Sequence, residues 1–102
     1  MKTKINNVIE RIATERQRQI DLGWTPEHDN EHDNGELVKA AICYALGDTE
    51  IRSPAGEMSV EINPFGVNFY RSIIAKPKVR QLEIAATLIV AEIERLERLE
   101  RV

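Results

Sequence analysis

Apolar side chains recur at helical spacing in two stretches of the first half of the chain. Over residues 4–22 they fall three, four and eight residues apart, on one helical face: Ile5, Val8, Ile9, Ile12 and Ile20. Over residues 35–46 a second stripe is built mostly from small side chains: Leu37, Ala40, Ala41, Tyr44 and Ala45. Gly23 and Gly47 follow the two stretches, where helices often end in a left-handed residue. The pattern predicts two helices, and the small residues of the second favour close approach of another helix.

A third and longer helical pattern covers residues 78–101, with Pro77 near its first turn. Its predicted core face consists of Leu82, Ala85, Ala86, Ile89, Ile93 and Leu96, widened by Ile84 and Leu88. An apolar face this wide is enough to bury two surfaces against one helix. Because the three helices offer two broad apolar faces, we expect a homodimer that shares its core.

Residues 48–76 lie between the second and third patterns and show no helical periodicity over most of their length. Turn signals at residues 53–56 (Ser-Pro-Ala-Gly) and 63–66 (Asn-Pro-Phe-Gly) flank a short alternating run at residues 58–62. A small hairpin fits this arrangement, while residues 67–74 fit either a strand or a helical turn. The sequence therefore predicts one all-α domain over residues 1–102, with an irregular, variable insertion at about residues 48–76.

Composition narrows the classes of function. The chain has 102 residues, 14 basic against 17 acidic, and a net charge of −3. This balance lacks the basic excess of a nucleic-acid-binding protein, and no apolar run reaches the ~20 residues of a membrane span. The single cysteine, Cys43, excludes an intrachain disulfide and fits a small buried side chain better than a nucleophile. The first residues lack the apolar segment of a signal peptide, so we expect a cytoplasmic location.

A polar, turn-rich segment joins the first two helical patterns. Its residues 27–36 include five carboxylates and two histidines but no basic side chain. One interpretation gives the segment only turn and capping roles, with Asp33 and Glu36 at the spacing of a capping box. A second makes it part of a site for Mg²⁺ or phosphate. A third places a transition-metal ion between His28 and His32, which are four residues apart.

Basic residues gather at two other places along the chain: Arg16 and Arg18 late in the first helix, and Arg71, Lys76, Lys78 and Arg80 on the way into the third. If they converge, they offer donors for phosphate oxygens; otherwise they are solvated charges. Arg16 approaches the apolar stripe, so it either extends from the edge of the bundle or lines an internal site with Gln19. Trp24 either fills the core or stacks on a base.

Several of these residues form a combined signature. It includes residues 15–19 (Glu-Arg-Gln-Arg-Gln), 23–29 (Gly-Trp-Thr-Pro-Glu-His-Asp), 35–37 (Gly-Glu-Leu) and 86–96 (Ala-Thr-Leu-Ile-Val-Ala-Glu-Ile-Glu-Arg-Leu). On these residues the chain resembles a family of short bacteriophage and prophage proteins that is grouped with the MazG-like dATP/dGTP diphosphohydrolases. The resemblance covers about residues 8–47 and 76–98, and it implies an all-α, MazG-like helical bundle that dimerises.

The resemblance also implies a chemistry. In MazG-like enzymes, acidic residues of two helices hold Mg²⁺, which bridges the phosphates of a nucleoside triphosphate and helps water release pyrophosphate. It implies Glu36 and Glu83 as catalytic acids and, together with Asp29, as metal ligands. His28 and His32 are further candidate ligands because of their spacing. Substrate contacts are expected from Arg16, Gln19, Trp24, Lys39, Tyr44 and Arg80. Only Glu36 of the family's EExxE motif is present, and Lys39 stands where its last glutamate would be.

Three functions are therefore considered. The first is a phage-type accessory protein that binds a nucleotide or its phosphates, with Mg²⁺-dependent pyrophosphohydrolysis of nucleoside triphosphates as its enzymatic form. The second is a non-catalytic module that binds a nucleotide signal or a host protein. The third is a transition-metal protein that uses His28 and His32. The site that the resemblance implies requires Arg16, Glu36 and Arg80 to face one water-accessible hollow. This hollow would lie where the end of one predicted helix meets the start of another.

Overall fold

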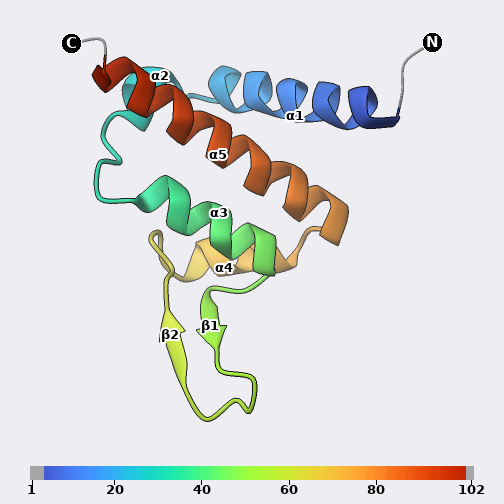
Figure 1. Cartoon of the computed structure of the whole chain (residues 1–102), viewed down its shortest axis with the longest axis vertical. Helices are drawn as coiled ribbons and strands as arrows, with labels where there is room; N and C mark the ends of the chain where they lie inside the picture. Colours follow the sequence, from blue (N-terminus) through green and yellow to red (C-terminus); the bar gives the residue numbers. More distant parts are fainter. Residues whose placement is uncertain (1–3, 101–102) are drawn as a thin grey trace.

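The computed structural model describes residues 4–100, with side chains from residue 6 onward, and is mainly α-helical (Figure 1). In chain order the elements are α1 (Lys4–Asp21), α2 (Pro26–Asp29), α3 (Glu36–Leu46), β1 (Glu50–Arg52), β2 (Ser59–Glu61), α4 (Val67–Ile74) and α5 (Lys78–Glu100). The three long helices lie close to their expected ranges, which confirms the mainly-α prediction. Within residues 4–100, no helix has the length and apolarity needed to cross a membrane.

Helix α5 runs through the middle of a flat molecule that measures 44 × 40 × 23 Å. Figure 1 shows α1 crossing one side of α5 and α3 lying along the other, with α4 beyond α3. Strands β1 and β2 form an antiparallel hairpin that projects from the helices, with Ile51 opposite Val60. The predicted hairpin is confirmed, and residues 67–74, for which the sequence left strand or helix open, form α4.

A small core lies where α3, α4 and α5 meet. It consists of Cys43, Tyr44, Ile73, Ile84 and Ala85, with Ile62, Phe69 and Leu88 packed against it. Ala40 and Ala41 of α3 are also buried, as their small size predicted, because α3 and α5 approach closely. Burial raises the pKa of the Cys43 thiol, and the charges of Glu61 and Asp48 raise it further. The prediction of a buried Cys43 is confirmed.

The expected core face of α5 is confirmed at Ile84 and Ala85, which are buried, but it is wrong for its large side chains in the single chain. Leu82, Ile89, Ile93 and Leu96 are 47%, 50%, 50% and 45% exposed. The buried face carries Gln81, Ile84, Ala85, Thr87, Ala91, Glu92 and Arg95. On α1, Val8 and Ile9 are exposed as well, and the Ile5 side chain lies outside the described ones. Periodicity identifies an apolar face of a helix, but it does not say whether that face packs inside the same chain.

The start of α3 also differs from expectation. Gly35, with φ of 80°, is its N-cap residue, so Asp33 does not form the predicted capping box with Glu36. The Glu36 carboxylate instead accepts a hydrogen bond from the Asn34 backbone N–H at 3.1 Å. At α2, Thr25 is the N-cap residue, and its hydroxyl accepts from the His28 N–H at 3.3 Å. Both contacts fix the chain on either side of the two histidines.

Candidate functional site

A cavity of about 350 Å³ opens between α1, α3, α4 and α5. Its apolar floor includes Leu37, Ala40, Ile84, Leu88 and Ala91. Four aromatic side chains contribute to its wall: Trp24, Tyr44, Phe65 and Phe69. Polar and charged side chains complete it: Glu15, Arg18, Gln19, Asp29, Asn68, Ser72 and Lys76. A largely apolar pocket with a few polar groups is the usual form of a small-molecule site.

The aromatic residues of the pocket belong to a continuous row of rings. In order, the row is Trp24, His28, His32, Phe65, Phe69 and Tyr44, and successive ring centroids lie 4.9, 4.9, 5.4, 5.2 and 5.5 Å apart. Every contact is edge to face, the arrangement that aromatic quadrupoles favour. The row connects the α2 segment to α4 and α3, so it holds together elements that share few other contacts.

Glu15 forms a charged group at the α1 side of the pocket. Its buried carboxylate accepts two hydrogen bonds from Arg18, each 2.8 Å long, and one from the Gln19 amide at 3.1 Å. Arg80 of α5 pairs with the same carboxylate. Burial alone would raise the pKa of Glu15, but the hydrogen bonds and charges of Arg18 and Arg80 lower it to about 2. Glu15 is therefore ionised at neutral pH.

Tyr44 lies between this group and a further cation. Burial raises the pKa of Tyr44, and the nearby Glu15 charge raises it further, so its hydroxyl stays neutral and can donate a hydrogen bond. The Lys76 Nζ is 5.8 Å from the centroid of the Tyr44 ring and donates to the Ser72 carbonyl at 2.8 Å. Arg18 and Lys76 thus border the same end of the pocket.

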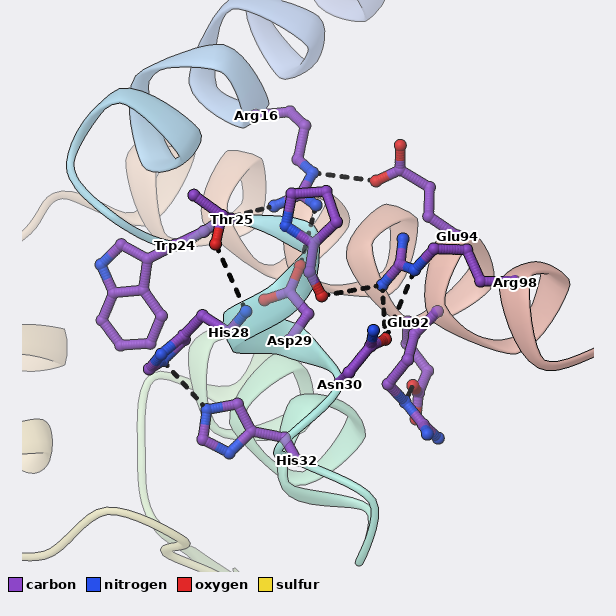
Figure 2. A network of polar contacts seen from close by, with 12 residues as sticks. Arg16, Trp24, Thr25, His28, Asp29, Asn30, His32, Glu92, Glu94 and Arg98 are labelled. Atoms are coloured by element: carbon purple, nitrogen blue, oxygen red, sulfur yellow. Dashed lines mark hydrogen bonds and ion pairs between the residues drawn. The ribbon is translucent and has the colours of Figure 1, made fainter.

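Arg16 does not reach the pocket as a free cation. Its guanidinium donates to the Asp29 carboxylate at 2.8 Å, to Glu94 at 2.9 Å and to the Trp24 carbonyl at 3.3 Å (Figure 2). Both Arg16 and Asp29 are buried. Figure 2 shows these contacts linking α1, the α2 segment and α5. The side chain was expected either at the bundle edge or in an internal site, and it is an internal link between elements.

The expected acidic pair is not brought together. Glu83 bonds to Arg11 at 2.6 Å near the start of α5. Glu36 lies within electrostatic range of Arg95, whose pKa is raised by its hydrogen bond to Glu92 and by the charges of Asp33 and Glu36. Positions 83 and 95 are separated by about 18 Å along the α5 axis. Arg16, Glu36 and Arg80 therefore do not face one hollow.

The described residues do not fit the Mg²⁺ site that the resemblance implies. Asp29 is paired with Arg16 and Glu83 with Arg11, while Glu36 accepts from the Asn34 backbone. Within residues 4–100, no three side chains among His, Cys, Asp and Glu are grouped so that they could hold one metal ion. His28 and His32 do lie together, with 3.2 Å between their Nε2 atoms.

Of the expected substrate contacts, the structure brings Gln19, Trp24 and Tyr44 to one pocket. Arg80 borders it through Glu15, whereas Lys39 is exposed on α3 and does not line it. Sequence reasoning missed the roles of Glu15, Arg18, Lys76, Phe65 and Phe69 in the pocket. The Phe65–Phe69 spacing of four residues was the available signal, but it lay in the segment whose secondary structure stayed open.

Comparison of the chain with protein families, with curated proteins and with solved structures finds no match. The resemblance to MazG-like proteins therefore stays an expectation that rests on the quoted residues. What bears on function is the geometry of the pocket, with its row of rings and the cations at one end.

Proposed function

We propose that this protein binds a nucleotide in the pocket between α1, α3, α4 and α5, with the base against the row of rings and the phosphate near Arg18 and Lys76. The single observation behind this proposal is that one cavity combines aromatic wall residues with cationic side chains. Edge and face contacts with aromatic rings suit a planar base. Guanidinium and ammonium groups suit phosphate oxygens.

The charges at the Tyr44 end of the pocket favour an anion. Three cations, Arg18, Lys76 and Arg80, lie near it, and Glu15 is shared between the two arginines. Arg80 also pairs with Glu83 at 3.5 Å, so Arg18 and Lys76 are the cations that line the pocket itself. Their charged groups would attract a phosphate to this end of the pocket.

The size of the pocket limits the ligand. At about 350 Å³ it lies near the lower end of the range for small-molecule sites, roughly 300–1,000 Å³. A single nucleoside with its phosphates suits this volume better than a dinucleotide. Gln19, Asn68 and Ser72 supply donors and acceptors for the edge of a base.

We favour binding without hydrolysis. The carboxylates expected to hold Mg²⁺ are paired with arginines or with a backbone N–H. Of the expected acidic pair, Glu83 lies near the start of α5, whereas Glu36 is the first residue of α3 and lies near Arg95 of α5. The non-catalytic alternative, a module that binds a nucleotide signal, needs only the pocket.

A thermal-shift and calorimetry panel tests the proposal. The ligands are a purine nucleoside, its mono- and triphosphates, and inorganic tripolyphosphate, each with and without Mg²⁺. We expect the nucleotides to raise the melting temperature most, because only they engage both the rings and the cations. Mg²⁺ should not be required, and no pyrophosphate should be released. A panel with no shift for any nucleotide would overturn the proposal.

A set of three lysine and arginine variants locates the site. Lys76→Ala should weaken nucleotide binding about tenfold, since a hydrogen bond to a charged group contributes about 1.5 kcal/mol or more. It should leave nucleoside binding unchanged. Lys39→Ala distinguishes this pocket from the site implied by the resemblance and should have no effect. Arg71→Ala, an exposed residue of α4 that does not line the pocket, is the matched control.

We also propose that two copies of the chain pair through α5. Positions 82, 86, 89, 93 and 96 alternate at spacings of four and three residues, which is the heptad pattern of helices that pack side by side. Leu82, Ile89, Ile93 and Leu96 are exposed on this face, and Val38 and Ile42 of neighbouring α3 are exposed too. A second copy offers the same pattern, so a twofold interface satisfies both chains at once.

A further inference from the structure

His28 and His32 are the two histidines of the chain, and their side chains converge. Their Nε2 atoms lie 3.2 Å apart, and the ring planes are inclined by 76° (Figure 2). Both residues are partly buried, and neither belongs to the Arg16 network beside them. The nucleotide pocket does not explain the pair, because neither imidazole lines the cavity.

Each of the two imidazole rings packs against one further aromatic ring. Trp24 packs edge to face against His28, and Phe65 packs in the same way against His32. The backbone between them is fixed as well, since the His32 N–H donates to the Asp29 carbonyl at 3.0 Å and Asp29 is paired with buried Arg16. The imidazoles therefore meet without having to be ordered first.

We propose that His28 and His32 form a two-imidazole site for a divalent transition-metal ion, with Zn²⁺ as the best fit. Two nitrogen ligands about 2.0–2.1 Å from a tetrahedral Zn²⁺ are roughly 3.3 Å apart. The 3.2 Å between the two Nε2 atoms is close to this value. Imidazole nitrogen selects zinc, copper and nickel over magnesium, so this site differs in chemistry from a carboxylate site for Mg²⁺.

The second nitrogen of His28 supports the same geometry. Its Nδ1 lies 3.8 Å from the Glu31 carboxylate, on the side of the ring away from His32. Histidine ligands of metals commonly turn their other ring nitrogen toward a carboxylate, which fixes the tautomer and orients the ring. In the metal-free protein the two Nε2 atoms share a hydrogen bond, so a metal ion that binds both of them replaces its proton.

The remaining coordination positions belong to water or to an anionic ligand. Within the described residues, no third His, Cys, Asp or Glu side chain joins the pair, and Cys43 is buried in the core. Trp24 and Phe65, which flank the pair, both line the nucleotide pocket. A metal ion that joins the two imidazoles would therefore stiffen one wall of that pocket. The site itself does not depend on the proposed function.

The single tryptophan of the chain provides a direct readout. The Trp24 ring centroid is 4.9 Å from that of His28, so Cu²⁺ bound at the pair should quench Trp24 fluorescence. A chelator such as EDTA should restore the signal by removing Cu²⁺, which binds imidazole more tightly than Zn²⁺ does, and Mg²⁺ should cause no quenching. The electron paramagnetic resonance spectrum of the Cu²⁺ form should show coupling to two imidazole nitrogens.

His28→Gln and His32→Gln should each weaken Zn²⁺ binding at least tenfold in calorimetry, and the double variant should abolish both binding and quenching. Glu27→Gln, an exposed carboxylate of the same helix, is the matched control and should bind as the wild type does. Circular dichroism checks that each variant is folded. If a variant unfolds, imidazole ¹⁵N shifts of the wild-type protein on addition of Zn²⁺ decide the question. Zn²⁺ binding that survives the double variant, or no binding to the wild type, overturns the proposal, whatever the nucleotide panel shows.

Discussion

The two faces of α5 reverse the usual arrangement of a surface helix. The inner face, which packs against α1 and α3, includes buried polar residues: Gln81, Thr87, Glu92 and Arg95. The outer face carries large apolar residues that are about half exposed: Leu82, Ile89, Ile93 and Leu96. Buried charge is tolerated only when it is paired and hydrogen-bonded, whereas exposed apolar surface marks an interface. The difference fits the proposal that a second copy of the chain covers the outer face of α5.

Partners for the inner face come from other elements as well as from α5. Arg95 bonds to Glu92 on the same helix, while the Gln81 amide donates to the Ile73 carbonyl of α4 at 2.9 Å. Among the described side chains, no buried nitrogen or oxygen atom lacks a hydrogen-bond partner. Packing of the inner face thus depends on matched hydrogen bonds and ion pairs. The outer face offers only its shape and its apolar side chains to a partner.

The largest expected effect on stability comes from removing Arg16, the buried cation of α1 that pairs with Asp29. Arg16→Ala leaves Asp29, which is 1% exposed, as an unpaired buried charge, so the free energy of unfolding should fall by about 3–5 kcal/mol. Urea unfolding followed by circular dichroism measures the loss. Arg11→Ala is the matched control, because Arg11 lies on the same helix, pairs with Glu83 of α5 and is exposed. It should cost less than about 1 kcal/mol. Equal losses would contradict the distinction.

A pH series tests the second buried charge. The pKa of Glu15 is lowered to about 2 in the folded state, against an ordinary value of 4.5. A group whose pKa is lowered on folding stabilises the protein above its unfolded pKa, and this stability is lost as the pH falls through the folded pKa. The contribution of Glu15, about 3 kcal/mol, should therefore be present at pH 5 and decline toward pH 2.

Glu15→Gln removes this contribution while keeping an amide of similar size. The variant should be less stable than the wild type at pH 7, and the difference should narrow as the pH falls from 5 to 2.5. Urea midpoints measured across this range provide the comparison. Glu57→Gln, in the exposed loop of the hairpin, should follow the wild type throughout. Parallel curves for Glu15→Gln and wild type would show that Glu15 is not the titrating group.

These side chains also show where sequence reasoning stops. The ranges of α1, α3 and α5 followed from apolar spacing and from Gly23 and Gly47. Helical periodicity and the end of a helix depend on residues close together in the sequence. The burial of the α5 faces did not follow. Whether a face packs inside the chain or outside it depends on elements far apart in sequence, such as α1 and α3.

The residues that line the pocket could be predicted from the sequence only in part. Trp24, Tyr44 and Gln19 were expected as substrate contacts from the resemblance, and the structure brings all three to one cavity. The ion pair of Arg16 could not be predicted, because Asp29 is one of five carboxylates within ten residues. To identify the right carboxylate, one must know the path of the turn between α1 and α2. The contact of Glu15 with Arg80 spans 65 residues and carries no local signal.

The outer face supplies the third prediction. Ile93→Ala removes apolar surface that a second copy would bury, at a cost of about 1 kcal/mol per chain and about 2 kcal/mol per dimer. The dissociation constant should therefore rise roughly thirtyfold, as measured by analytical ultracentrifugation. Stability of the dilute single chain should change little, because Ile93 is already half exposed there. Val60→Ala, an exposed residue of the hairpin, is the control and should leave association unchanged. A wild-type chain that stays monomeric at high concentration would contradict the pairing.

The smallest expected effect lies at Thr87, at the centre of the inner face. Its side chain is fully buried, and its hydroxyl donates to the Glu83 carbonyl one turn earlier in α5 at 2.7 Å. Thr87→Val keeps the shape and removes only this bond, while the carbonyl keeps its helical partner. The free energy of unfolding should therefore fall by about 0.5–1 kcal/mol, and urea unfolding can resolve this change. Thr14→Val, an exposed threonine of α1, is the matched control and should be nearly neutral. A loss above about 2 kcal/mol at Thr87 would mean that the inner face depends on each of its polar groups, and not mainly on its buried charges.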